Sequence, residues 1–311
     1  MLEERSAEYR AFMRHIQATA AQRHRDSGSL AGIRQVMDGV GRAFPLAHDI
    51  RVVPVDCDGV RAEWIDAPVS AADRIVLYAH GGWYISGAGA TVREFCSRLA
   101  RDGRCRVLSV DYRLAPEHPV PAALDVTLAC YRWLLAQGIP SARIVVAGES
   151  AGGGLTIALL MRCRDRGLPM PAAGVPISPW VDMEVRFGAS LVRNLGVDMA
   201  SVEPLCIGAR LYAGDANRRH PLASPLHGDL HGLPPLLIQV GTAEVLLDEG
   251  LEIARRLTAA GCAVTLREWP DMIHVWHWFG ALFPEAREAI AEIGDYVLAH
   301  VPDAVQEGRL T

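Results

Sequence analysis

The sequence predicts an α/β fold, a mainly parallel sheet of eight strands with helices on both faces and a helical cap. Three observations support this prediction. Apolar, β-branched runs recur along the chain, and most of the later ones alternate with helix-like stretches. Two helical segments, at the N-terminus and at about 181–214, fall outside that alternation. Finally, 50% of the 311 residues are hydrophobic, which supplies ample material for one large core.

The first segment, residues 1–45, is predicted to be helical and to pack onto the later core as a cap segment. Tyr9, Met13 and Ile16 recur at helical spacing, and a second helix is expected over 30–40 after a break at 26–29. Helical appendages beside the ligand-binding ends of strands can form lids. A purely structural appendage is the alternative.

Residues 46–311 are predicted to form the main domain. It opens with a hairpin of strands 50–55 and 60–65, joined across a turn that contains Gly59. The later strands are expected at 74–79, 106–110, 144–149, 174–178, 236–240 and 263–267, with helices at 90–101, 121–136, 155–161, 247–260 and 284–300. The interruption at about 181–214 is mixed and helical, so we expect a second cap segment there.

Charge and cysteine content exclude several classes of function. The net charge is −5 and neither sign is clustered, which argues against a nucleic-acid or anionic-membrane partner. No apolar run approaches the roughly 20 residues of a membrane span. The seven cysteines are widely spaced and form no C-x-x-C pair, so neither a disulfide framework nor a metal site is expected. With a charged N-terminus and no predicted signal peptide, the expected location is the cytoplasm.

The strand at 144–149 runs into a G-x-S-x-G pattern formed by Gly148, Ser150 and Gly152. This pattern is typical of a nucleophile elbow, in which a tight turn strains the serine backbone and exposes its hydroxyl above the sheet. The helix that follows directs its N-terminal N–H groups to the same place. The alternative is a glycine-rich turn with an incidental serine.

Candidate oxyanion donors follow the strand at 74–79, where the chain continues His80-Gly81-Gly82-Trp83. Adjacent glycines allow backbone N–H groups to approach a substrate oxygen closely. The position, before the elbow strand, suits an HGGG-type oxyanion loop, whereas the motif by itself is equally compatible with a simple turn. Ala151, directly after the serine, would supply a further N–H.

A serine nucleophile needs a base and an orienting acid, which in this chain order follow it in loops after later strands. Among eleven histidines, His274 and His277 follow the last predicted strand. For the acid, Glu244 lies in the turn after strand 236–240, and Asp248 lies about one helical turn later, ~6 Å along the axis. Both carboxylates therefore cannot reach one imidazole, and Asp248 better suits a helix N-terminus.

These residues belong to a set of motifs that resembles the bacterial hormone-sensitive-lipase family of carboxylesterases, within the α/β hydrolases. The motifs occur in family order between about 75 and 275: His80-Gly81-Gly82, Asp111–Pro119 with Pro121–Ala123, Gly148–Gly153, Ser224–Leu226, Leu233–Pro235, Leu247–Gly250 and Met272–His274. The D-Y-R-L-A-P-E run is the most specific of them. The first 70 residues match only in being helical and then strand-like.

The resemblance implies a serine carboxylesterase that hydrolyses short- to medium-chain acyl esters, with Ser150 as nucleophile and His274 as general base. The N–H groups of Gly81, Gly82 and Ala151 would form the oxyanion hole. It also implies a small-molecule ester as the substrate, no cofactor and no metal, and a homodimer is a suggestion at family level only.

The chain departs from the family pattern at two positions. Trp83 stands where the family has a third glycine, which places a bulky ring close to the pocket. The family has aspartate followed by proline at the acid position, whereas this chain has Glu244. His274 lies 30 residues after Glu244, an interval that fits the family, and Asp248 aligns with a second, supporting aspartate. We therefore expect Glu244 to be the acid.

Two alternatives to an esterase follow from the same residues. An amidase, peptidase or lactonase would use the same triad, because leaving-group preference depends on the shape of the cap and the pocket. A non-catalytic small-molecule receptor on this fold would be expected to lack a triad member, and this chain lacks none.

Overall fold

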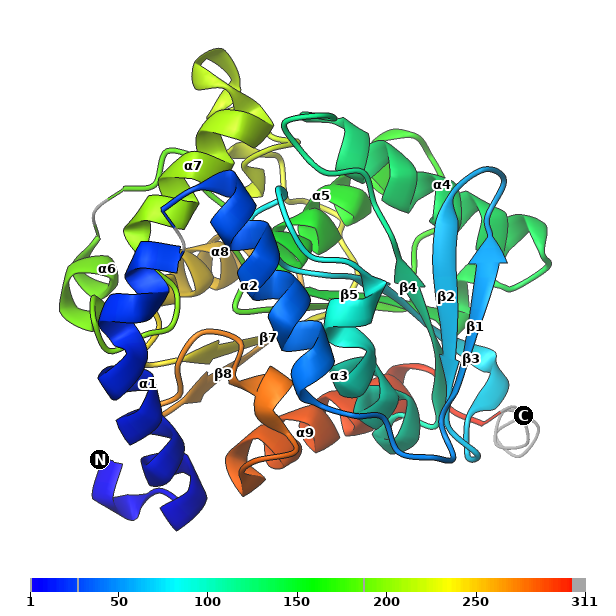
Figure 1. The fold of residues 1–311 in the computed structure, drawn as a ribbon. Coiled ribbons are helices and arrows are strands. Elements are labelled where there is room, and N and C mark those ends of the chain that lie inside the picture. Colours follow the sequence, from blue (N-terminus) through cyan, green and yellow to red (C-terminus); the bar gives the residue numbers. More distant parts are fainter. Residues whose placement is uncertain (1, 27, 187, 304–311) are drawn as a thin grey trace.

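A computed structural model describes residues 2–26, 28–186 and 188–303 (Figure 1). Its eight-stranded sheet has the order β1-β2-β4-β3-β5-β6-β7-β8. β1 pairs antiparallel with β2, and β2 with β4, whereas all the other neighbours are parallel. The strands are β1 Arg51–Asp56, β2 Arg61–Asp66, β3 Ala71–Ala79, β4 Cys105–Val110, β5 Ile144–Glu149, β6 Ala173–Ile177, β7 Leu236–Gly241 and β8 Val264–Trp269. The predicted eight-stranded, mainly parallel sheet is confirmed.

Helices cover both faces of the sheet (Figure 1). α3 (Gly89–Asp102) and α9 (Pro284–His300) pack on one face, and α4 (Ala122–Ala136), α5 (Ala151–Asp165) and α8 (Leu247–Ala259) on the other. The side chains of β3 alternate between the two cores: Leu77 packs with α4 and α5, while Val76 and Tyr78 pack with α3. Burial on both faces explains the near-continuous apolar runs of the central strands.

Four further helices lie left of centre in Figure 1: α1 (Ala7–Asp26), α2 (Leu30–Ala43), α6 (Ala189–Asn194) and α7 (Val202–Ala213). α1 is anchored near the C-terminal part of the chain, where the Tyr9 ring packs 5.0 Å from that of Phe283 and its hydroxyl donates to the Asp271 carbonyl at 2.6 Å. None of the helices that the structure describes is long and apolar enough to cross a bilayer.

Helices α1, α2, α6 and α7 occupy the two regions that the sequence assigned to a cap. Residues 1, 27, 187 and 304–311 of the predicted segments lie outside the described residues. Short 3₁₀ helices complete the chain at Leu2–Glu4, Ser141–Arg143, Asp215–Asn217, Pro225–His227 and Trp276–Phe279.

The parallel strands bring the candidate residues together. Gly81 follows β3, Ser150 follows β5, Glu244 follows β7 and His274 follows β8. The carboxyl ends of parallel strands meet at one edge of the sheet, which is where ligands bind in open α/β folds. Residues far apart in sequence thus come to one place.

Candidate active site

Ser150 lies in a strained turn between β5 and α5. Its backbone has φ 55° and ψ −117°, a conformation that L-residues rarely adopt. The turn requires glycine at the neighbouring positions: a Cβ on Gly152 would lie 1.9 Å from the Ala79 carbonyl oxygen, and one on Gly148 2.5 Å from it. The turn therefore has the geometry of a nucleophile elbow.

The side chains of His274 and Glu244 contact each other. The imidazole Nδ1 lies 3.0 Å from Glu244 Oε2. The other carboxylate oxygen, Oε1, accepts hydrogen bonds from the Ser178 hydroxyl at 2.7 Å and from the Gly241 N–H at 2.5 Å. Glu244 is fully buried, so these contacts fix its orientation toward the imidazole. Ser178 was not singled out in the sequence, because no motif surrounds it.

Negative charges around His274 favour its protonated form. Burial by itself lowers the pKa of this imidazole, but the hydrogen bond to Glu244 and the charges of Glu244, Asp198 and Glu149 outweigh burial and raise the pKa above its ordinary value. A base with a raised pKa, held by a carboxylate at Nδ1, is suited to accept a proton at Nε2.

The alternative acid and base have other partners. The Asp248 carboxylate accepts the Ser190 N–H at 2.8 Å, at the start of α8. His277 Nε2 pairs with Gln239 Oε1 at 2.7 Å, and burial, followed by the charge on His274, lowers the pKa of His277 to about 3. His277 is therefore a neutral core residue.

The loop after β3 contains Gly82 and Trp83 with φ of 117° and 55°. A Cβ on Gly82 would lie 2.2 Å from the Ser86 carbonyl oxygen, so only glycine fits there. The backbone N–H groups of Gly82, Trp83 and Ala151 have no acceptor among the residues that the structure describes. Unpaired N–H groups beside a serine are what an oxyanion site requires.

Gly81 differs from the expectation. Its N–H donates to the carboxylate of Glu149, which also accepts the Tyr78 hydroxyl. Burial raises the pKa of Glu149 to about 7, although the hydrogen bonds from Tyr78 and Gly81 lower it. Glu149 thus ties the loop after β3 to the elbow, and the Gly81 N–H already has a buried partner. In the sequence, the only sign of this contact is the position of the Glu149 carboxylate directly before the serine.

An apolar pocket opens at Ser150 and His274. Its volume is about 150 Å³, which is below the roughly 300–1,000 Å³ of typical ligand pockets. The walls come from α2, the loop after β3, the segment before and at the start of α7, and the loop after β8. The lining residues besides Ser150 and His274 are Ile33, Val36, Met37, Val40, Gly82, Trp83, Met199, Ala200, Ser201, Pro204, Val275, Trp278 and Phe279.

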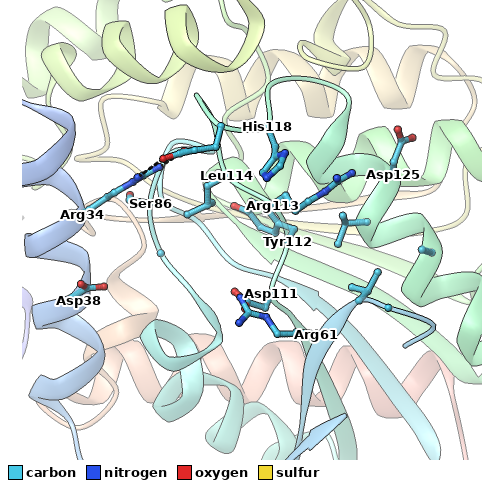
Figure 2. Close-up of a pocket in the computed structure, with 16 residues that line it drawn as sticks. Arg34, Asp38, Arg61, Ser86, Asp111, Tyr112, Arg113, Leu114, His118 and Asp125 are labelled. Carbon is cyan, nitrogen blue, oxygen red and sulfur yellow. Dashed lines mark hydrogen bonds and ion pairs between the residues drawn. The ribbon is translucent and has the colours of Figure 1, made fainter. Parts of the chain in front are cut away.

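A larger, more open hollow of about 720 Å³ lies along the Arg34 and Asp38 side of α2 (Figure 2). Its lining mixes polar and apolar side chains and carries both signs of charge. From α2, the Arg34 guanidinium donates to both carboxylate oxygens of Glu117, at 2.8 and 2.6 Å, and to the carbonyls of Ile85 and Ala115 at 2.8 and 3.1 Å. Arg34 thereby attaches α2 to the loops at 82–86 and 113–117.

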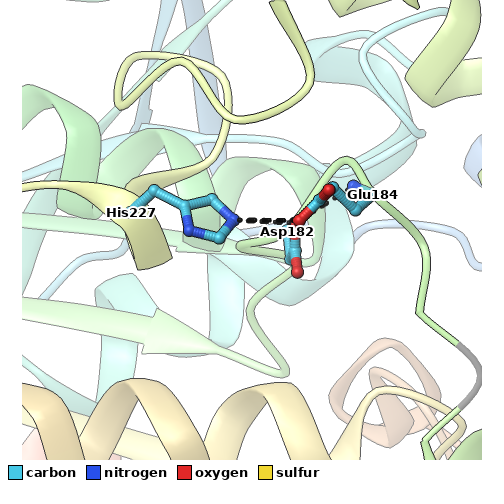
Figure 3. A group of neighbouring side chains, drawn as sticks. All are labelled: Asp182, Glu184 and His227. Atoms are coloured by element: carbon cyan, nitrogen blue, oxygen red, sulfur yellow. Dashed lines mark hydrogen bonds and ion pairs between the residues drawn. The ribbon is translucent and has the colours of Figure 1, made fainter.

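Asp182, Glu184 and His227 form a group whose ligand-type atoms lie within 4.8 Å of one another (Figure 3). His227 Nε2 lies 3.2 Å from Asp182 Oδ1 and 3.6 Å from Glu184 Oε2. Arg186 lies 3.5 Å from Asp182, and Arg219 lies 3.8 Å from Glu184. The two guanidinium groups already oppose the carboxylate charge, so we interpret the group as an ion-pair network.

Known proteins resemble the chain over most of its length. A family model described as the alpha/beta hydrolase fold matches residues 76–278. An acetyl-hydrolase from Streptomyces hygroscopicus is 44% identical over 277 residues, which cover 88% of this chain and 91% of the relative. An esterase from Acinetobacter venetianus is 34% identical over 265 residues, covering 85% and 87%.

A solved structure gives the same result. The crystal structure of an esterase from the bacterial hormone-sensitive lipase family aligns with a TM-score of 0.89 and 43% identity, covering 95% of this chain and 99% of that one. Fold and relatives together define the class, an α/β hydrolase that cleaves carboxylic esters. Within that class, the chain belongs to the bacterial hormone-sensitive-lipase family of esterases. The predicted family and enzyme class are confirmed, and the receptor alternative is set aside.

Proposed function

We propose that the chain hydrolyses short-chain acyl esters through a Ser150–His274–Glu244 triad and an acyl-enzyme. The observation that carries the proposal is the 3.0 Å contact between His274 Nδ1 and Glu244 Oε2, together with an apolar pocket lined by both Ser150 and His274. A carboxylate on Nδ1 selects the tautomer whose Nε2 is free to take the proton of the serine hydroxyl.

The reaction has two half-steps in this proposal. The Ser150 oxygen attacks the ester carbonyl while His274 takes its proton, and the tetrahedral intermediate then expels the alcohol, which receives that proton. Water attacks the acyl-enzyme by the same route and releases the acid. Glu244 stays ionised throughout and stabilises the imidazolium.

For the oxyanion hole we propose the N–H groups of Gly82 and Ala151, joined by that of Trp83. Gly81, which the sequence analysis included, is replaced because its N–H donates to Glu149. The absence of another acceptor for the three proposed groups among the described residues supports this set. Each such donor is worth about 3 kcal/mol in known examples.

We further propose that residues 1–45 and about 181–214 form the cap and limit the acyl chain. The support is the contribution of α2 and of residues 199–204 to the pocket wall. With a volume of about 150 Å³, the pocket favours the short end of the range of acyl chains, and the name of the acetyl-hydrolase relative agrees with that choice.

The test uses p-nitrophenyl esters with acyl chains of increasing length. We expect the highest kcat/KM for the shortest acyl groups, with a steep loss as the chain outgrows the pocket. Ser150→Ala should lower kcat by about 10⁶-fold and Glu244→Ala by about 10⁴-fold, following other serine hydrolases. Asp248→Ala is the matched control for the acid and should stay within about tenfold of wild type.

Two results would contradict the proposal. Activity that survives in Ser150→Ala would refute the mechanism. An inactive Asp248→Ala beside a nearly normal Glu244→Ala would refute the choice of acid.

A further inference from the structure

A third buried carboxylate touches both loops that carry the proposed acid and base. Asp198 lies between α6 and α7, in the segment assigned to the cap. Its Oδ1 accepts the His274 backbone N–H at 2.8 Å and the Met199 N–H at 2.7 Å, and its Oδ2 accepts the Val245 N–H at 2.8 Å. One side chain thus joins the loop after β7, the loop after β8 and the cap.

Asp198 is buried and, within the part of the chain that the structure describes, has no cationic side chain beside it other than the imidazole of His274. The residue is 4% exposed, and no arginine among the described residues forms an ion pair with it. All three of its hydrogen-bond partners are backbone N–H groups. Burial raises the pKa of Asp198 to about 6, while the charge of His274 and the N–H groups of Val245 and His274 favour the ionised carboxylate. Burying a carboxylate without a permanent counter-ion costs folding free energy, which its three hydrogen bonds offset only in part.

Neighbouring side chains extend the same connection. Asn194 donates from Nδ2 to the Glu244 carbonyl at 2.6 Å and to the Thr242 carbonyl at 3.1 Å. The Ser190 hydroxyl donates to the Val245 carbonyl at 3.0 Å. These contacts reach only the acid loop. Asp198 is the member of the group that also holds the backbone of the base.

We propose that Asp198 is a positioning residue for ester hydrolysis, which holds the His274 and Glu244 loops in register from the cap and stabilises the imidazolium by its charge. This inference rests on the proposed triad. Loss of the carboxylate would leave buried N–H groups unpaired on both loops at once, which loosens the approach of Nδ1 to Glu244. It would also remove one negative charge that faces the protonated base.

Asp198→Asn separates the role of the charge from that of size. Asparagine has the same shape as aspartate, but one of its two terminal groups is an NH₂. That group would face a backbone N–H and cannot accept a hydrogen bond from it. We expect kcat for a p-nitrophenyl acetate assay to fall by about 10- to 100-fold with KM within about threefold. The acid limb of kcat/KM should move to lower pH, because removing a negative charge lowers the pKa of His274.

The pH readout takes account of the other groups around the base. The titratable side chains that face His274 or Asp198 are Glu244, Glu149, His277 and Tyr9. None of them is changed in Asp198→Asn. Ser190→Ala is the matched control, since it weakens the link between the cap and the acid loop without touching His274, and its acid limb should stay in place.

The outcomes distinguish this inference from the proposed function. A folded Asp198→Asn with wild-type kcat, or with reduced kcat and an unmoved acid limb, would overturn the positioning role while Ser150→Ala remained inactive. Activity in Ser150→Ala would instead refute the triad itself. If Asp198→Asn does not fold, as judged by circular dichroism, the smaller Asp198→Ser is measured against the same expectations.

Discussion

In the proposed mechanism, the environment of a single residue, His274, determines how activity depends on pH. Its pKa is raised, so the imidazole stays protonated, and unable to act as a base, up to a higher pH than a free imidazole would. We therefore expect kcat/KM to fall as the pH is lowered, with an apparent pKa above 6.5, the ordinary value for imidazole. A pH profile of p-nitrophenyl acetate hydrolysis measures it.

Glu244→Gln provides the control for that profile. Glutamine removes the charge nearest the imidazole, so the acid limb should shift to lower pH while kcat falls steeply. A wild-type limb at or below the ordinary imidazole value, or a limb that is unchanged in Glu244→Gln, would contradict the assignment of His274 as the titrating base.

Ser178 allows a second test at the scale of one side chain. Its hydroxyl donates to Glu244 Oε1 at 2.7 Å in a fully buried setting. Ser178→Ala leaves that oxygen with the Gly241 N–H alone, so we expect kcat to fall by about tenfold with little change in KM. Ser97→Ala is the control, because among the described residues the Ser97 hydroxyl bonds only the Glu94 carbonyl of its own helix. Equal activity of the two variants would show that Ser178 does not orient the acid.

At the scale of elements, the elbow depends on how closely β3 approaches α5. A Cβ on Gly152 would lie 1.9 Å from the Ala79 carbonyl oxygen. Gly152→Ala should therefore push the two elements apart and destabilise the fold by about 1–3 kcal/mol, with a larger fractional loss of activity. Thermal unfolding and kcat measure the two effects.

Gly39→Ala is the matched control for that substitution. Gly39 lies on α2, where a Cβ would meet nothing within 4 Å, so alanine should raise stability by about 0.5–1 kcal/mol. If Gly152→Ala proved as stable and active as Gly39→Ala, the close approach at the elbow would not be a constraint.

The sequence predicted which helices and strands exist more accurately than it predicted where each one begins and ends. α9 spans Pro284–His300, as expected from its periodicity. α5 begins at Ala151, earlier than the predicted 155, because Gly152–Gly154 are poor helix formers and hid the first turn. Those glycines are required by packing: a Cβ on Gly154 would lie 2.1 Å from the Trp180 carbonyl oxygen. Local propensity gave no sign of that contact.

The same limit applies to the supporting residues of the site. Strand order and motif spacing, together with the family resemblance, singled out Ser150, His274 and Glu244 as candidates, and the loops that carry them lie at one edge of the sheet. Ser178 and Asp198 bond groups 66 and 76 residues away, at Glu244 and His274. A partnership at such separation leaves no periodic pattern in one sequence.

At the scale of the whole molecule, α2 is held over the pocket by Arg34. The ion pair between Arg34 and Glu117 is partly exposed. The hydrogen bond from the Arg34 guanidinium lowers the pKa of the Glu117 carboxyl to about 2. Such pairs add only about 0–1 kcal/mol of stability. We expect Arg34→Ala to raise KM by about threefold to tenfold, because α2 forms one wall of the pocket, with a small change in melting temperature.

Arg255→Ala controls for the loss of an exposed ion pair. Arg255 pairs with Glu252 on α8, away from the pocket-lining residues. The KM of Arg255→Ala should equal that of wild type. An unchanged KM in Arg34→Ala would show that α2 keeps its place without this contact.

The position of Asp198 within the chain has a consequence for engineering. Met199, Ala200 and Ser201 line the pocket beside Ser150, and the Asp198 carboxylate, which contacts the loop of His274, directly precedes them. A mutant library spread across this stretch to admit bulkier esters would alter substrate choice and turnover together. Chimeras that exchange residues 198–201 between relatives would inherit substrate choice and turnover together. Holding Asp198 fixed while its neighbours vary should let the two properties be selected separately.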